Sequence, residues 1–365
     1  MNFKILLSGI ILNLVYSFCS AAKIDVIVDG IKYQCENDEA SVIGSSEKVD
    51  SAFVKDTIIA DGNEYIVTSI NSLPYPNFVY LPNTIKKIGK NAFGNRLNSI
   101  NIPSSVEYIE KDAFWNVLGK LNRVDIDDIS SWCNIEFADE GANPFFANMY
   151  YLLHAQLYLY VKGEKITDLI IPENVVELKK YVFLGYELLE NVSIPNSVLY
   201  IRDYAFRYCK NLKNVTIPNS VQKIGNSAFD SCDSLKTITL GNNIKEIGNY
   251  AFDYCNKVTT VNCYSTIPPV IFERTFYPQI EYDGILHVPV GTKDLYASSQ
   301  YWSKFSAIID DLEYEAGIDN VQGLQDDNIK IYNVNGIFCG DNINNLKRGL
   351  YLIKQNNNVK KVFIP

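Results

Sequence analysis

The sequence repeats itself with a period of 23 residues, and this period limits what the chain can fold into. The segment Ile194-Pro-Asn-Ser-Val198 returns as Ile217-Pro-Asn-Ser-Val221, and the pair Ala-Phe at 205–206 returns at 228–229 and 251–252. A fixed period of this size indicates a solenoid, in which every unit packs only on its neighbours. A solenoid presents an extended surface rather than a deep cleft, so the period favours recognition over catalysis.

One unit, residues 212–232, shows how the repeat is expected to fold. It carries more apolar residues than a single unit can bury, and stacked units share them in one continuous core. Polar and apolar residues alternate towards its first proline, which predicts a short strand with Val215 and Ile217 inward and Thr216 outward. Pro218 ends the strand because proline has no N–H for the ladder. A second extended stretch and a helical turn complete the unit.

Phenylalanine and cysteine mark two core positions of the repeat. The residues at the first position are Phe93, Phe114, Phe183, Phe206, Phe229 and Phe252. Phe114 and Phe183 lie three periods apart, which predicts two degenerate units between them, over residues 124–166. The residues at the second position are Cys209, Cys232 and Cys255. These cysteines are expected to be stacked, buried free thiols, although rungs about 4.8 Å apart also permit a disulfide.

The consensus of the units is Leu-x-x-Ile/Val-x-Ile-Pro-x-Ser-Val-x-x-Ile-x-x-x-Ala-Phe-x-x-Cys, and it resembles the BspA-like (Treponema pallidum-type) leucine-rich repeat. Residues 81–262 carry the pattern, with Gly241 standing where a proline is expected. The resemblance implies a repeat solenoid, a right-handed superhelix of short parallel strands with brief helical turns. Solenoids need atypical ends that cover the core. Residues 23–80 are therefore expected to form an N-terminal β cap and residues 263–316 a C-terminal cap.

Residues 1–22 are predicted to be a secretory signal peptide. Lys4 is followed by an apolar run over residues 5–15, and small residues offer a cleavage site before Lys23. The run is shorter than the ~20 residues that span a bilayer, which disfavours a membrane anchor. A lipoprotein attached through Cys19 is disfavoured because a bulky residue precedes it. Once this segment is removed, the sequence predicts no transmembrane segment and an exported protein.

The C-terminal residues 329–365 follow a different pattern. Three strands are predicted, over 329–336, 346–353 and 360–364, and the polar, acidic residues 317–328 form a linker before them. This small β domain resembles the C-terminal sorting domain of the Bacteroidetes type IX secretion system. The resemblance implies passage through the periplasm to the outer surface, often with removal of the domain. The alternative is a plain β-hairpin cap on the solenoid.

Composition and motifs argue against several classes of function. The formal net charge is -9, whereas nucleic acid selects basic surfaces. The chain has two histidines, His154 and His287, so a Ser-His-Asp or Cys-His site has almost no candidates. The sequence lacks glycine-rich phosphate motifs, HExxH and CxxC, and we expect no cofactor and no metal. The remaining enzyme alternative is a paired-carboxylate glycosidase within residues 124–166.

Two surfaces are candidates for binding. The first is the strand face, where the outward residues are polar and mostly uncharged, and where we expect no aromatic platforms for sugar rings. Its candidate residues are Asn101, Asn191, Ser193, Asn214, Thr216, Thr237, Thr239 and Asn262. The second is a tyrosine band of Tyr181, Tyr204, Tyr208, Tyr250 and Tyr254. Either set has a structural alternative, since strand residues can simply be solvated and tyrosines can shield the edges of rungs.

The repeats and the export signal together predict a non-catalytic, exported binding protein on the outer surface of a bacterium or in its surroundings. The resemblance implies adhesion, with an extracellular protein or glycan as the partner recognised by the repeat face. The alternative is a structural, self-associating envelope protein in which the solenoid is a rigid spacer.

Overall fold

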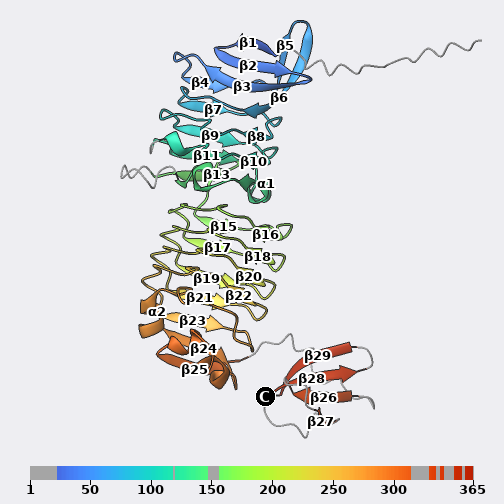
Figure 1. Cartoon of the computed structure of the whole chain (residues 1–365), viewed down its shortest axis with the longest axis vertical. Coiled ribbons are helices and arrows are strands. Elements are labelled where there is room, and N and C mark those ends of the chain that lie inside the picture. The colour runs from blue at the N-terminus through green and yellow to red at the C-terminus, as the bar shows by residue number, and fades with distance from the viewer. Residues whose placement is uncertain are drawn as a thin grey trace, which may run out of the picture.

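The computed structural model describes residues 23–117, 120–146, 156–313, 329–333, 338–340, 349–355 and 358–364. The predicted signal peptide and linker lie outside the described residues. Most of the described chain winds into one long stack of rungs, with the strands of residues 24–70 at one end and those of residues 285–312 at the other (Figure 1). The repeat solenoid predicted from the 23-residue period is confirmed.

An eight-stranded sheet forms one side of the N-terminal half, in the order β1-β2-β3-β6-β8-β10-β12 with β5 beside β6. Its strands are Ile24–Val28 (β1), Ile31–Glu36 (β2), Glu39–Ser45 (β3), Thr57–Ala60 (β5), Asn63–Ile70 (β6), Lys87–Ile88 (β8), Tyr108–Ile109 (β10) and Glu136–Phe137 (β12). The pairs β1–β2, β2–β3 and β5–β6 are antiparallel, and the rung pairs that follow are parallel. The antiparallel strands cover the open end of the core, where Tyr33 is fully buried.

A six-stranded sheet forms the other side of this half, in the order β14-β13-β11-β9-β7-β4. Its strands are Ser51–Phe53 (β4), Phe78–Tyr80 (β7), Ser99–Ile102 (β9), Arg123–Ile126 (β11), Tyr158–Val161 (β13) and Glu164–Lys165 (β14). All pairs are parallel except the terminal hairpin of β13 and β14. Every second side chain is buried, so the residues between them face outward.

The C-terminal half repeats this arrangement in parallel sheets. On the strand face, β15 (Asp168–Ile170) pairs with β17 (Asn191–Ser193), and a five-stranded sheet contains β19 (Asn214–Ile217), β21 (Thr237–Leu240), β23 (Thr260–Cys263), β24 (Ile285–Pro289) and β25 (Ala307–Leu312). The opposite side contains β16 (Glu177–Leu178), β18 (Tyr200–Ile201), β20 (Lys223–Ile224) and β22 (Glu246–Ile247). The stack thus keeps one strand face along its length.

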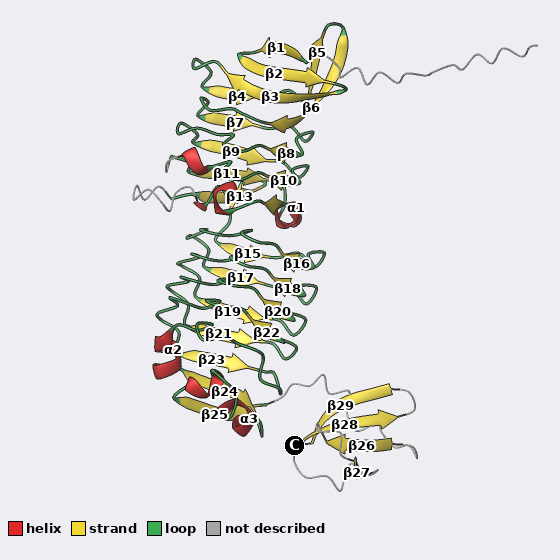
Figure 2. Ribbon diagram, in the orientation of Figure 1, coloured by secondary structure: helices red, strands yellow, loops and turns green. Residues whose placement is uncertain are grey.

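Helices are few and short, as Figure 2 shows. They are α1 (Ile129–Asn134), α2 (Pro278–Asp283) and α3 (Lys293–Ala297), with 3-10 turns at Trp115–Val117, Glu140–Ala142 and Trp302–Lys304. The last rungs enclose Tyr296 and Trp302, whose polar atoms donate to the backbone oxygens of Ser265 and Pro269 at 2.7 and 2.8 Å. These aromatic residues close the C-terminal end of the core.

One row of the core consists of phenylalanine side chains that recur from rung to rung. Phe183, Phe206, Phe229, Phe252 and Phe276 stack with ring centroids 5.2–5.6 Å apart. Phe93 and Phe114 are also in contact, with ring centroids 4.9 Å apart, but their planes are tilted by 32°. All six phenylalanines of the predicted core position are buried. Aromatic pairs of this kind add about 0.5–1.5 kcal/mol each to the effect of burial.

The predicted cysteine position is also stacked and buried. Cys209, Cys232 and Cys255 are free thiols, and each Sγ donates to the carbonyl of a core phenylalanine in the preceding rung at 3.2–3.4 Å. A disulfide would remove these hydrogen bonds. The thiol therefore serves as a small apolar side chain with one weak donor.

The turn beside the core phenylalanine is held by the next rung. The N–H groups of Phe183, Phe206 and Phe229 each donate at 2.8 Å to an alanine carbonyl one period further on. The turn therefore does not continue as a helix along its own chain, because these N–H groups are bonded between rungs. Each rung has a backbone ladder here as well as on its two strand sides, which satisfies groups that would otherwise be buried without partners.

The degenerate stretch contains one enlarged rung and one incomplete rung. The enlarged rung runs from β11 through α1 and β12. The next begins with β13 but folds back as the hairpin β13–β14 before the chain enters β15. The second of the two predicted units is thus not a complete turn. Side chains join the two halves: Trp132 Nε1 donates to Val182 O at 2.8 Å, Asn143 Nδ2 donates to Tyr181 O at 2.6 Å, and the Tyr186 hydroxyl donates to Ile166 O.

The C-terminal tail forms four strands where the sequence predicted three. They are Ile329–Asn333 (β26), Phe338–Gly340 (β27), Gly349–Gln355 (β28) and Asn358–Ile364 (β29), in the antiparallel order β27-β26-β28-β29. Strand β27 was missed because three residues are too few to show an alternating pattern.

At certain corners neighbouring rungs approach each other so closely that only glycine fits. A Cβ on Gly225 would lie 2.4 Å from the backbone nitrogen of Asp203, and one on Gly241 would lie 2.5 Å from the oxygen of Pro218. Gly241 is the position where the repeat pattern has a proline, and this corner has no room for one. By contrast, a Cβ on Gly44 would meet no atom within 4 Å.

We therefore expect Gly225→Ala to lower the free energy of unfolding by about 1–3 kcal/mol, because the added methyl group must push two rungs apart. The control Gly44→Ala should leave stability unchanged or slightly raised. Urea unfolding followed by circular dichroism measures both. Equal stability of the two variants would contradict the close packing of rungs.

Buried thiols make the fold sensitive to alkali. Burial raises the pKa of Cys133 to about 12 and that of Cys263 to about 11, from an ordinary value of 9.0. Below pH 9 the folded and unfolded chains both hold these protons, and the stabilisation is fully present. Above pH 9 only the unfolded chain releases them, so stability falls as pH rises through 11–12.

We expect the urea midpoint to decrease between pH 9 and pH 10.5, and to decrease less steeply in Cys263→Ala, which lacks one such proton. Midpoints measured at pH 7, 9 and 10.5 test this. Identical slopes for the parent and the variant would show that the Cys263 thiol does not contribute.

Candidate functional site

The outward residues of β19, β21 and β23 form two polar rows on the strand face. Asn214 pairs in register with Thr237, and Thr216 with Thr239, whose next partner is Asn262. The structure thus brings five of the predicted residues together on one strip. Their side chains are short and stand on a sheet, so little conformational freedom is lost when a ligand binds them.

Of the other three predicted residues, two continue this strip and one lies apart from it. Asn191 and Ser193 precede Asn214 and Thr216 by one period, and their strand lies beside β19. Asn191 and Ser193 stand on β17, which pairs with β15, and the Asn191 amide donates to the carboxylate of Asp168. Asn101 lies on β9 in the N-terminal half. Its amide bonds both backbone groups of Leu81, accepting at 2.7 Å and donating at 2.8 Å. Asn101 therefore has a structural role that the sequence did not indicate.

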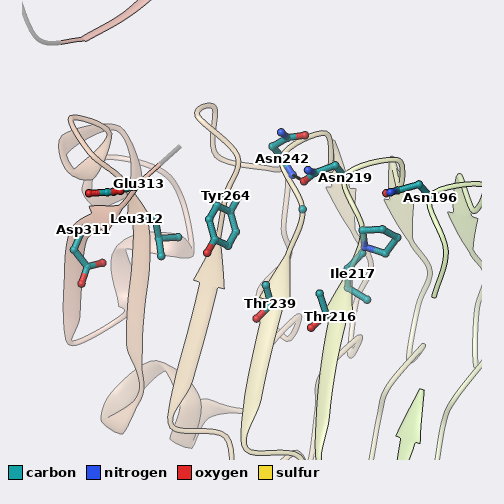
Figure 3. A pocket seen from close by; sticks show the side chains of 12 residues that line it. Asn196, Thr216, Ile217, Asn219, Thr239, Asn242, Tyr264, Asp311, Leu312 and Glu313 are labelled. Carbon is teal, nitrogen blue, oxygen red and sulfur yellow. Dashed lines mark hydrogen bonds between the residues drawn. The ribbon is translucent and has the colours of Figure 1, made fainter. Parts of the chain in front are cut away.

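A pocket of about 580 Å³ opens where the strands of the polar strip end (Figure 3). Thr216 and Thr239 line it from the strands, Asn219 and Asn242 from the corner loops, and Tyr264 stands beside them. The last strand of the solenoid, β25, supplies the far wall. The pocket is therefore made by several rungs together.

An asparagine ladder forms the corner of this pocket. Asn219 Oδ1 accepts from the backbone N–H of Asn242 at 2.9 Å, one period away. The side-chain oxygen of Asn242 is buried and has no hydrogen-bond partner among the described residues. Sequence reasoning missed this ladder, although the repeated Pro-Asn-Ser triplet was its signal.

The N-terminal part of the strand face carries aromatic side chains, so the expectation that this face lacks them is wrong. Phe53 and Tyr80 are register partners on β4 and β7, and their rings stack at 4.5 Å with planes 3° apart. Tyr158 and Tyr160 stand on β13. The repeat pattern could not predict that these aromatic residues lie on the strand face, because they belong to the cap and to the degenerate stretch, outside the 23-residue period.

A second pocket, of about 460 Å³, lies between these aromatic groups. Ser99 and Asn101 line it from β9, Tyr80 from one neighbouring strand, and Arg123 and Asp125 from the other. Arg123 Nε and Nη2 donate to both carboxylate oxygens of Asp125 at 2.6 and 2.7 Å. The hydrogen bonds to Asp125 raise the pKa of Arg123, so the guanidinium stays charged throughout the physiological pH range.

The tyrosine band lies at the turn side of the rungs, in an uncommon backbone conformation. Tyr181, Tyr204 and Tyr250 share one repeat position, Tyr208 and Tyr254 another, and all have φ between 53° and 65°. This left-handed conformation costs a side-chain-bearing residue about 1–2 kcal/mol. Hydrogen bonds between rungs hold it, for example from Tyr204 N and Tyr208 N to carbonyl oxygens of the next rung at 3.0 and 2.8 Å.

The band is not continuous. Ser227 and Ser231 occupy the two positions in the unit between, so the tyrosines fall into two groups. In the first group Tyr181 stacks on Tyr204 at 5.2 Å. In the second, Tyr250 and Tyr254 are about half exposed. The stacked pair fits a shielding role, while the exposed pair is available for contact.

Arg207 is fixed between the tyrosines of the first group. Its guanidinium lies 4.5 Å from the ring centroid of Tyr208 and bonds Asp230 at 2.8 Å and Glu140 at 3.0 Å. Burial raises the pKa of the Asp230 carboxyl. This effect is larger than the lowering of the pKa by the hydrogen bond from Ser231 and by the charge of Arg207. These contacts connect the repeat unit to the enlarged rung, which indicates a structural role for the cluster.

The described part of the chain offers little for catalysis or metal binding. Within it, no group of three His, Cys, Asp or Glu side chains could hold a metal ion. His287 lies on β24 and bonds the carboxylate of Asp311 at 2.7 Å, and His154 lies outside the described residues. None of the helices in the described ranges is long and apolar enough to span a bilayer.

The chain belongs to the BspA type leucine-rich repeat family. The family model matches six copies over residues 72–140 and 156–279, which together exceed half of the chain. The resemblance of the repeat units is thereby confirmed, and the gap between the matches, residues 141–155, lies between β12 and β13 in the sequence. Membership in this family indicates a role in repeat-based binding or recognition.

Several solved structures are similar to the chain. A leucine-rich repeat protein from Bacteroides ovatus is 23% identical, with 67% of this chain and 72% of that chain covered and a TM-score of 0.38. The pneumococcal vaccine antigen PcpA is 16% identical, with 80% and 100% covered and a TM-score of 0.37. A leucine-rich cell surface protein from Faecalibacterium prausnitzii is 17% identical, with 80% and 99% covered and a TM-score of 0.31. No curated protein matches the chain.

Proposed function

We propose that this is a non-catalytic, exported protein that recognises an extracellular protein or glycan through its strand face and mediates adhesion. The observation that carries the proposal is the strand face itself, on which outward side chains from successive rungs line two pockets. Extended surfaces of this kind are what solenoids use for binding. Localisation at the outer surface of a bacterium, or secretion, is part of the proposal.

The chemistry of the polar strip supports recognition of neutral, hydrogen-bonding groups. Asn214, Thr216, Thr237 and Thr239 offer amides and hydroxyls, which both donate and accept. Because these groups stand on a hydrogen-bonded sheet, they are held in place before a ligand arrives, which limits the entropy cost of binding.

We expect the full chain to bind at least one component of an array of extracellular-matrix proteins and glycans. A variant with Asn191, Asn214, Thr216, Thr237 and Thr239 changed to alanine should bind that component at least tenfold more weakly, a loss of about 1.4 kcal/mol. A control variant with Glu107→Ala, Lys223→Ala and Lys245→Ala changes other faces and should bind like the parent.

Each outcome of the array is informative. Binding that survives in the strand-face variant would contradict the assignment to this face and favour the tyrosine band. Absence of binding at micromolar concentration would contradict the adhesion proposal. Concentration-dependent oligomers in sedimentation would then support the structural alternative.

We propose further that residues 329–365 act as a C-terminal sorting domain. Its sheet is antiparallel, whereas the solenoid rungs pair in parallel, which supports a unit with a separate role.

Deletion of residues 329–365 should leave the solenoid folded but retain the protein in the periplasm of the producing bacterium, as measured by cell fractionation. Cys339→Ser keeps the tail and should be delivered normally. Normal delivery of the deleted protein would contradict this role.

A further inference from the structure

We infer that the pocket between β7 and β11 is a saccharide slot that holds one pyranose ring of a neutral glycan. Tyr80 would contact the C–H face of the sugar, and the Arg123–Asp125 pair would bond its hydroxyl groups. The inference rests on the proposed recognition function and narrows its ligand to a chemical class. Four features of the pocket support it.

The width of the slot follows from its side chains. Strands β7, β9 and β11 are neighbours, so the residues of the two outer strands stand about 10 Å apart, or two ladder spacings. On the middle strand the outward residues are Ser99 and Asn101, which are short. Large side chains on β7 and β11 thus stand on either side of the short side chains of β9, and the space between them suits one flat ring.

One wall is an aromatic platform whose far side is already covered. The ring of Tyr80 stacks on Phe53 with planes 3° apart, and Tyr80 remains 47% exposed. Because Phe53 lies on the strand before Tyr80, the uncovered face of Tyr80 is directed along the stack towards β9. A ring in the slot would continue this stack. The apolar C–H face of a pyranose matches an aromatic face, and the tyrosine hydroxyl leaves the rim polar.

The other wall presents donors and acceptors side by side. Asp125 accepts one hydrogen bond from Arg123 on each carboxylate oxygen, which leaves further lone pairs on both. Arg123 keeps N–H groups that Asp125 does not use, and its far face lies 4.0 Å from the ring centroid of Tyr160. Adjacent sugar hydroxyls also donate and accept side by side. Since the pair is neutral overall, it favours a neutral polyol over a phosphate or sulfate.

The slot is held in shape before binding. The Asn101 amide is bonded to both backbone groups of Leu81, Tyr80 is stacked, and Arg123 lies between Asp125 and Tyr160. Fixed side chains of this kind reduce the ordering cost that weakens most saccharide binding. An extended peptide would instead seek unpaired backbone along a strand edge. In the slot, β9 is paired on both sides.

The test uses the full chain with maltotetraose, cellotetraose and mannotetraose as neutral probes and chondroitin sulfate as the anionic comparator. Saturation-transfer NMR detects contact, and calorimetry measures affinity. We expect at least one neutral probe to bind. Tyr80→Ala and Asp125→Asn should each weaken it at least tenfold, while Tyr80→Phe, which keeps the platform, should stay within threefold of the parent. Lys223→Ala, on β20 at the opposite side of the stack, is the control, and circular dichroism verifies that each variant is folded.

Three results would overturn the inference: no neutral probe binds the folded parent, binding survives Tyr80→Ala, or only chondroitin sulfate binds. If the chain binds matrix proteins but no saccharide, the slot assignment fails and the proposed recognition function stands. If a protein ligand is lost in Tyr80→Ala without saccharide binding, the slot recognises a protein instead. If nothing binds in either experiment, both proposals fail.

Discussion

Hydrogen bonding between equivalent backbone groups of successive rungs is the constraint on which the whole structure depends. The strand side, the opposite side and the turn beside the core phenylalanine are each bonded to the neighbouring rung. In the regular rungs each residue therefore lies beside its equivalent one period away. A side chain is compatible with this arrangement only if it packs well against a copy of itself, and phenylalanine rings and cysteine thiols both do so.

The same constraint explains how the solenoid tolerates its one irregular region. At the enlarged rung the backbone ladder is interrupted, and carbonyl groups on either side need other partners. Trp132, Asn143 and Tyr186 supply them through side-chain hydrogen bonds. Tyr186 stands at the repeat position that elsewhere holds cysteine, where a longer side chain can reach across the interruption. At this junction the buried polar groups therefore keep hydrogen-bond partners although the repeat period is broken.

The outward residues are free of this packing constraint, which is why the surface differs along the stack. In the C-terminal half the strand face repeats threonine and asparagine and forms an even polar strip. In the N-terminal half the number of residues per rung varies, and aromatic and charged residues lie around β9. The left-handed backbone of the tyrosine band shows the opposite case, since hydrogen bonds between rungs impose an uncommon conformation on Tyr204 and Tyr208. Irregular spacing therefore coincides with the most distinctive pocket.

The sequence by itself determined the solenoid, the inward residues of each regular rung and the polar strip of β19, β21 and β23. A strict period places equivalent residues in register, so one unit describes its neighbours. Only the tertiary structure decided what happens where the period fails: the hairpin after β13, the fourth strand of the tail and the slot between Tyr80 and Arg123. Those features join residues such as Phe53 and Tyr80, or Ser99 and Arg123, at spacings that no repeat specifies. Their contact depends on which strands pair, and that pairing is set by the packing of the whole rung rather than by local sequence.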